Sequence, residues 1–107
     1  MTQKVFLGTE IKLNVSIDPI GDMTMDDYDF NVEAICGTFK KRSVTFKKVQ
    51  AIRVDENNFI ICLDTAAVGT GELKLKVTAF LPDGDFADGK RTEIVEVGTG
   101  VEIVKTM

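Results

Sequence analysis

Residues 73–81 read LKLKVTAFL, and this stretch sets the pattern for the whole chain. Side chains of a β-strand point alternately to opposite faces, so the alternation predicts a strand with one apolar face on a core. Burial of each large side chain contributes about 1.5 to 3 kcal/mol, against a net stability of about 5 to 15 kcal/mol for a domain. The residues expected to face inward are Leu73, Leu75, Val77, Ala79 and Leu81.

The same alternation recurs in residues 10–17 (EIKLNVSI) and 28–36 (YDFNVEAIC), which predict two further strands with one buried face. Residues 59–63 (FIICL) are apolar at nearly every position, which indicates a strand buried on both faces or nearly so. Asp64 is expected to cap one helical turn. Weaker strand patterns cover residues 4–7, 39–48, 49–54 and 91–104, the last bent or bulged at 98–100.

These strands, separated by turns rich in Gly, Pro, Asp and Asn, predict an all-β fold. We expect an antiparallel, immunoglobulin-like (Ig-like) β-sandwich of about seven strands, with a small open barrel as the competing geometry. A length of 107 residues is that of one domain, so residues 1–107 are assigned to a single β-sandwich domain.

Composition and charge disfavour several classes of protein for this chain. Hydrophobic residues make up 44% and charged residues 28% of the chain, as in folded soluble proteins. Neither a membrane-spanning run nor a secretory signal is recognisable, so synthesis in the cytoplasm is expected. The net charge of −4 disfavours nucleic-acid binding.

One basic segment leaves a nucleic-acid alternative open, because cations beside aromatic residues are typical of single-strand binders. Phe46 is in phase with Val44, which assigns it to the core and the segment to a charged sheet edge. The residues of the segment are Phe39, Lys40, Lys41, Arg42, Phe46, Lys47 and Lys48.

The chain contains no histidine, which excludes Ser-His-Asp and Cys-His catalysis and histidine metal sites; we expect no enzyme activity and no cofactor. Two loops are rich in aspartate, and the favoured interpretation is solvated turns. Asp83, Asp85 and Asp88 are weak candidates for Ca²⁺, although their spacing is not that of an EF-hand.

Cys36 and Cys62 are the only cysteines. Both lie in apolar strand patterns, so buried free thiols are the favoured interpretation. A disulfide between them across the core is the alternative, and two thiols without histidine do not predict a zinc site.

The order of features resembles the small Ig-like β-sandwich modules of tailed-bacteriophage virion proteins. The modules concerned are the N-terminal domain of baseplate upper proteins and the fibre-attachment modules of Bacteroidales phages and prophages. The resemblance covers most of the chain. It rests on EIKLNVSI (residues 10–17), DDYDFNVEAI (26–35), GELKLKV (71–77) after Asp64, and TEIVEVGTG (92–100).

The resemblance implies a non-enzymatic structural or adaptor module in a virion, made in the bacterial cytoplasm and acting through protein–protein assembly. Its partners would be other virion proteins or further copies of itself, as a homo-oligomer. Ile35, Phe80 and Phe86 are the interface candidates, since the expected register places them outside the core. The alternative is that Ile35 and Phe80 pack against the second sheet or a covering loop. The rival function is a carbohydrate- or cell-surface-binding module, with or without Ca²⁺.

Overall fold

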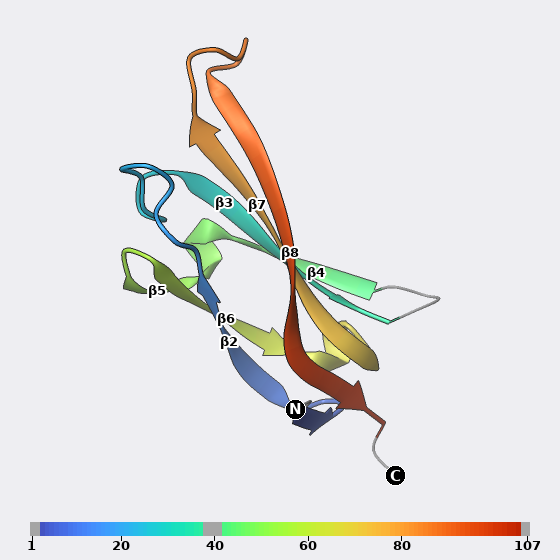
Figure 1. The fold of residues 1–107 in the computed structure, drawn as a ribbon. Helices are drawn as coiled ribbons and strands as arrows, with labels where there is room; N and C mark the ends of the chain where they lie inside the picture. Colours follow the sequence, from blue (N-terminus) through green and yellow to red (C-terminus); the bar gives the residue numbers. More distant parts are fainter. Residues whose placement is uncertain (1–2, 38–41, 106–107) are drawn as a thin grey trace.

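Two stacked β-sheets make up the fold in the computed structural model of the chain, which describes residues 3–37 and 42–105 (Figure 1). The larger sheet has the strand order β1-β8-β7-β3-β4, and the smaller has the order β2-β6-β5. The strands are β1 (Gln3–Phe6), β2 (Glu10–Ser16), β3 (Asp29–Cys36), β4 (Arg42–Lys47), β5 (Ile52–Asp55), β6 (Asn58–Asp64), β7 (Gly71–Pro82) and β8 (Lys90–Val104). Two 3-10 turns are η1 (Lys48–Gln50) and η2 (Thr65–Ala67).

The expected all-β fold with two sheets is confirmed, and the two separate sheets do not form the alternative barrel. The described residues form eight strands, close to the expected seven, and the weak strand pattern at residues 4–7 corresponds to β1. One detail differs from the prediction of an antiparallel sandwich. β1 pairs with β8 in parallel, whereas every other strand pair is antiparallel.

The core lies between the sheets and is built from the alternating residues that the sequence indicates. On β7 the side chains from Leu73 to Leu81 at every second position are 0% to 6% exposed. Tyr28 and every second residue of β3 are buried in the same way, and the inward residues of β2 are half-buried or buried. The sheets meet where the Phe30 and Phe59 rings pack edge to face, with centroids 5.1 Å apart.

The prediction that β6 is buried on both faces is wrong. Phe59 and Leu63 are buried on its inner face, but Ile60 on the outer face is only half-buried and Cys62 is exposed. The smaller sheet has water on its outer side. Both cysteines are free thiols: Cys36 is buried as expected, and burial raises the pKa of its thiol, whereas Cys62 is not buried.

The two local turn predictions are confirmed. Asp64 caps η2, since its side chain accepts a hydrogen bond from the backbone N–H of Ala66 at 3.0 Å. The bulge in β8 appears as a register shift against β7. There the Thr99 hydroxyl donates to the Leu73 carbonyl at 2.9 Å, which satisfies an acceptor that the regular ladder leaves free.

A buried hydroxyl joins the start of β2 to the end of β6. Thr65 is 0% exposed. Its Oγ1 accepts from the Gly8 N–H at 2.8 Å and donates to the Thr9 carbonyl at 2.8 Å. Tyr28 is also buried, but its hydroxyl has no hydrogen-bond partner among the described residues. Burial and the negative charge of Glu93 raise the pKa of this phenol.

These two hydroxyls predict opposite mutational effects. Thr65→Val removes both hydrogen bonds of this hydroxyl, each contributing about 0.5 to 1.5 kcal/mol, so we expect it to lower the free energy of unfolding by about 1 to 3 kcal/mol. Tyr28→Phe removes a hydroxyl that has no partner and should leave stability unchanged or raise it. Urea denaturation of both variants measures the difference, and equal losses would contradict the hydrogen-bond assignment.

Candidate functional site

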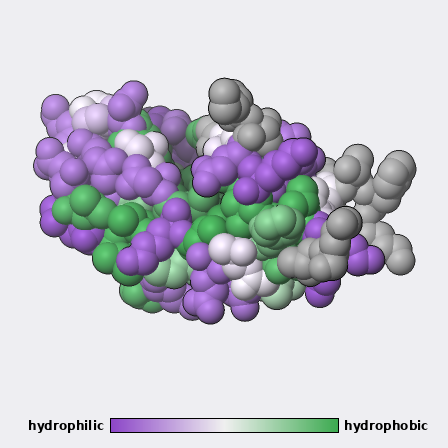
Figure 2. All heavy atoms as spheres, turned by 90° about the horizontal axis from the view of Figure 1, so that it is seen from below, coloured by the Kyte–Doolittle hydropathy of each residue, from purple (hydrophilic) through white to green (hydrophobic). Residues whose placement is uncertain are grey.

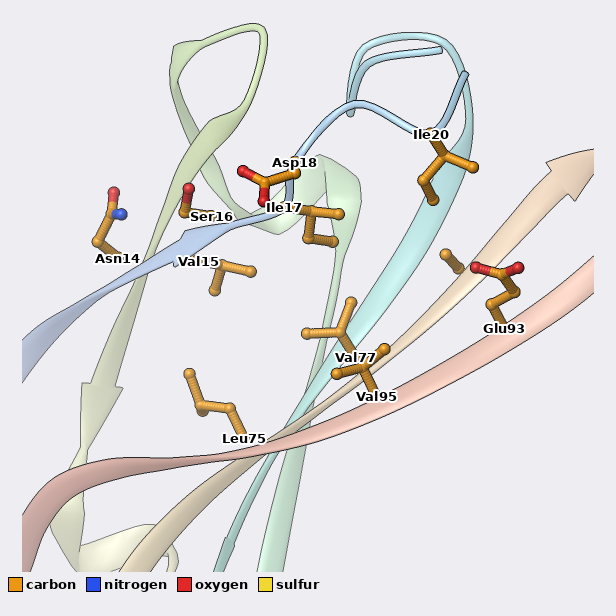
Figure 3. A pocket seen from close by; sticks show the side chains of 11 residues that line it. Asn14, Val15, Ser16, Ile17, Asp18, Ile20, Leu75, Val77, Glu93 and Val95 are labelled. Carbon is orange, nitrogen blue, oxygen red and sulfur yellow. The ribbon is translucent and has the colours of Figure 1, made fainter. Parts of the chain in front are cut away.

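An apolar groove opens between the two sheets, along the side formed by β2 and β8. Its volume is about 400 Å³. Figure 3 shows Val15 and Ile17 of β2 and its following loop facing Val77 and Val95 across the opening, with Leu75 below them. Ile20 closes one end. The lining is that of a hydrophobic core that is accessible from one side.

The groove follows from the strand pairing. β1 pairs with β8 only along Val101–Val104, so within the described residues the N-terminal half of β8 is paired with β7 on one side and has no strand on the other. β2 is likewise paired on one side only, by β6. Two free strand edges therefore face each other across an unfilled part of the core. Free edges of this kind are where proteins add strands from other chains.

Two carboxylates border the groove, and an arginine pairs with one of them. Asp18 and Glu93 are the ionisable residues that line it, and no cation does so among the described residues. An Arg91 nitrogen lies 3.4 Å from a Glu93 oxygen, and the other terminal nitrogen lies 3.5 Å from Asp83. Asp18 has no ion pair in the described part of the chain. A partner bearing a cation would suit this lining.

The opposite side of the sandwich, at β4 and β5, is basic. Arg42 and Lys47 are exposed and form no ion pair within residues 3–37 and 42–105. Lys48 is used internally: its Nζ donates to the Tyr28 carbonyl at 2.8 Å. Arg53 is paired with Asp26, with nitrogen and oxygen 2.8 Å apart, and this contact lowers the pKa of the Asp26 carboxyl.

Phe46 of this basic segment is half-buried and packs against the core, as its phase with Val44 predicts. It is therefore not free to stack on a nucleotide base. Phe39, Lys40 and Lys41 lie outside the described residues.

Large apolar side chains are exposed mainly at the sheet edges. Val49, Ile52 and Val54 lie on or beside β5, and Ile94 and Val95 lie on the free half of β8. Each is at least 51% exposed, and Val49 is 89% exposed. Phe6 on β1 and Phe86 in the β7–β8 hairpin are also exposed. On the face drawn in Figure 2, hydrophobic surface forms a band between hydrophilic residues.

The three interface candidates from the sequence are not gathered in one patch. Ile35 and Phe80 are half-buried on the outer face of the larger sheet, opposite Lys74 and Thr92 respectively. Six residues of β7 separate their levels, which is about 20 Å. Phe86 is 49% exposed in the hairpin that projects beyond β7 and β8 (Figure 1).

Ile94 and Val95 were not identified from the sequence as exposed apolar residues, although the sequence contains an indication for one of them. Ile94 and Val95 are adjacent, and neighbouring residues of a strand face opposite sides, so one of them must point away from the core. Nothing in the sequence pattern predicts that Val95, which is on the inner face of the sheet, is exposed. It depends on which strands lie beside β8.

The weak calcium candidates serve as turn residues. The side chain of Asp83 accepts from the Asp85 N–H at 3.0 Å, and that of Asp88 accepts from the Lys90 N–H at 3.1 Å. Among the described residues, no three acidic, cysteine or histidine side chains come close enough together to hold a metal ion.

No protein-family model matches the sequence, and a comparison with curated proteins finds no significant relative. In the part of the chain that the structure describes, no helix has the length and apolar character needed to cross a membrane.

The groove can be tested by filling it. Ala79 lines the groove, whereas Ala34 lies at 0% exposure in the closed core. We expect Ala79→Ile to be tolerated or to stabilise the protein, because the added atoms enter open space. Ala34→Ile should cost about 1 to 3 kcal/mol through overpacking. Thermal denaturation of the pair checks this, and equal destabilisation would show that the groove is closed.

Proposed function

We propose that this chain is a non-enzymatic structural module of a phage or prophage virion that works through protein–protein assembly. The observation that carries the proposal is the exposure of large apolar side chains on strands at opposite edges of the sandwich: Ile52 and Val54 on one side, Ile94 and Val95 on the other. Exposed apolar surface framed by polar residues is typical of protein interfaces.

We further propose that the fold is Ig-like. In variable-type Ig sandwiches, strands G, F, C and C′ form one sheet and B, E and D belong to the other. Labelling β2 to β8 in turn as B, C, C′, D, E, F and G reproduces these neighbours, with β1 beside G as a short first strand. This order supports the sequence resemblance to virion modules, in which such domains attach fibres and baseplate parts.

The alternative of carbohydrate binding receives less support. Carbohydrate sites commonly present aromatic side chains on the surface, but the chain has no Trp, and its one Tyr, Tyr28, is 3% exposed. An enzyme is disfavoured by the lack of histidine. The groove is apolar with two carboxylates at its sides, which suits an apolar polypeptide segment better than a sugar.

Size-exclusion chromatography with light scattering, over a wide dilution series, tests assembly. We expect the average mass to rise with concentration. Ile94→Lys should abolish the rise, because it places a charge within the apolar edge. Ala67→Lys in η2 adds the same charge away from the edge strands and should leave the rise intact.

A strict monomer at every concentration would contradict self-assembly. If the melting temperature of that monomer also rose on addition of a glycan, the carbohydrate-binding alternative would replace the proposal.

A further inference from the structure

We infer that copies of this chain associate head to tail, with β4 of one copy adding as a further strand to the free edge of β8 of the next. This inference rests on the proposed function and identifies the surfaces that carry it.

Both strands have an edge available for pairing. β4 ends the strand order of the larger sheet and is bonded only to β3, along Arg42–Lys47. β8 is bonded to β7, and its residues 90–97 have no strand on the other side in the described part of the chain. Each edge therefore presents backbone N–H and C=O groups that a neighbouring strand can satisfy.

Strand direction permits this contact without turning the partner over. β8, β7, β3 and β4 are successively antiparallel, so β4 runs opposite to β8. A second copy placed beside the first in the same orientation therefore meets it with an antiparallel pair. Antiparallel pairing is the more stable of the two arrangements per residue.

The inner faces of the two strands also match. Val44 and Phe46 are half-buried at the β4 edge, and Val95 is exposed beside the groove at the β8 edge. A register that sets Phe46 opposite Val95 continues the apolar core from one copy into the groove of the next. On the outer face, the same register sets Thr45 opposite Glu96.

Charge favours this contact over contact between two β4 edges. β4 carries Arg42 and Lys47 and no carboxylate, whereas the free edge of β8 carries Glu93 and Glu96 beside Lys90 and Arg91, and Asp18 lies across the groove. Two β4 edges would bring cations together, which is unfavourable. A contact between different edges is heterologous and repeats from copy to copy, so it produces a ring or a filament.

Disulfide trapping tests the contact. Two variants are made, each with Cys62→Ser to remove the exposed thiol: one carries Thr45→Cys and the other Glu96→Cys. Directly opposed residues of paired strands have Cβ atoms about 4.5 to 5.5 Å apart, close to disulfide range. A mixture of the two variants should form a cross-linked heterodimer on mild oxidation, and neither variant alone should do so.

Thr92→Cys, also with Cys62→Ser, is the matched control. Thr92 is exposed on the same strand and face as Glu96 but lies about 13 Å further along it. It should not cross-link with Thr45→Cys.

The outcomes separate the two proposals. If the wild type assembles but Glu96→Cys alone cross-links to itself, or the mixture fails to cross-link, the β4-to-β8 contact is wrong and assembly stands. If the wild type stays monomeric at all concentrations, the proposed function fails and this inference fails with it.

Discussion

Burial of two facing apolar rows, one from each sheet, is the constraint on which the structure depends. The Phe30 and Phe59 rings join the two sheets in this contact, and β3 and β7 supply most of the closed core. The sheets are unequal, with five strands against three. The two sheets therefore cover each other's apolar residues in the middle of the sandwich but not fully at the β2–β8 side. There Val77 and Ala79 of β7 are buried, but Val95 of β8 is exposed.

An incomplete edge has consequences for function because strand edges and apolar surface attract the same kind of partner, another polypeptide chain. Natural edge strands are commonly protected from such contacts by charges, and β4 has Arg42 and Lys47 for this purpose. A cationic edge repels a copy of itself but not an edge lined by carboxylates. The cations of β4 thus disfavour contact between two β4 edges, and Asp18 beside the groove, which has no ion pair among the described residues, is a carboxylate that they could approach.

Much of the fold could be predicted from alternation and turn chemistry. The inward rows of β3 and β7, the cap at Asp64 and the bulge at Thr99 all depend on residues close in sequence, and local physics determines them. The prediction for β6 was wrong because an apolar run indicates only that burial of its side chains is favourable. It does not indicate whether another layer of the protein covers each face of the strand. Cys62 is exposed because no third layer from the described residues packs on the smaller sheet.

The candidate site was less accessible to prediction. Ile35 and Phe80 were expected outside the core, and they lie on the outer face of the larger sheet, but at levels that do not form one surface. The groove depends on residues from β2, β7 and β8, whose proximity no single stretch of sequence encodes. Period-two patterning by itself determined which residues face inward, because the strand geometry is local. Strand order decided which of those residues remain uncovered, because coverage requires a neighbour that only the tertiary structure can provide or withhold.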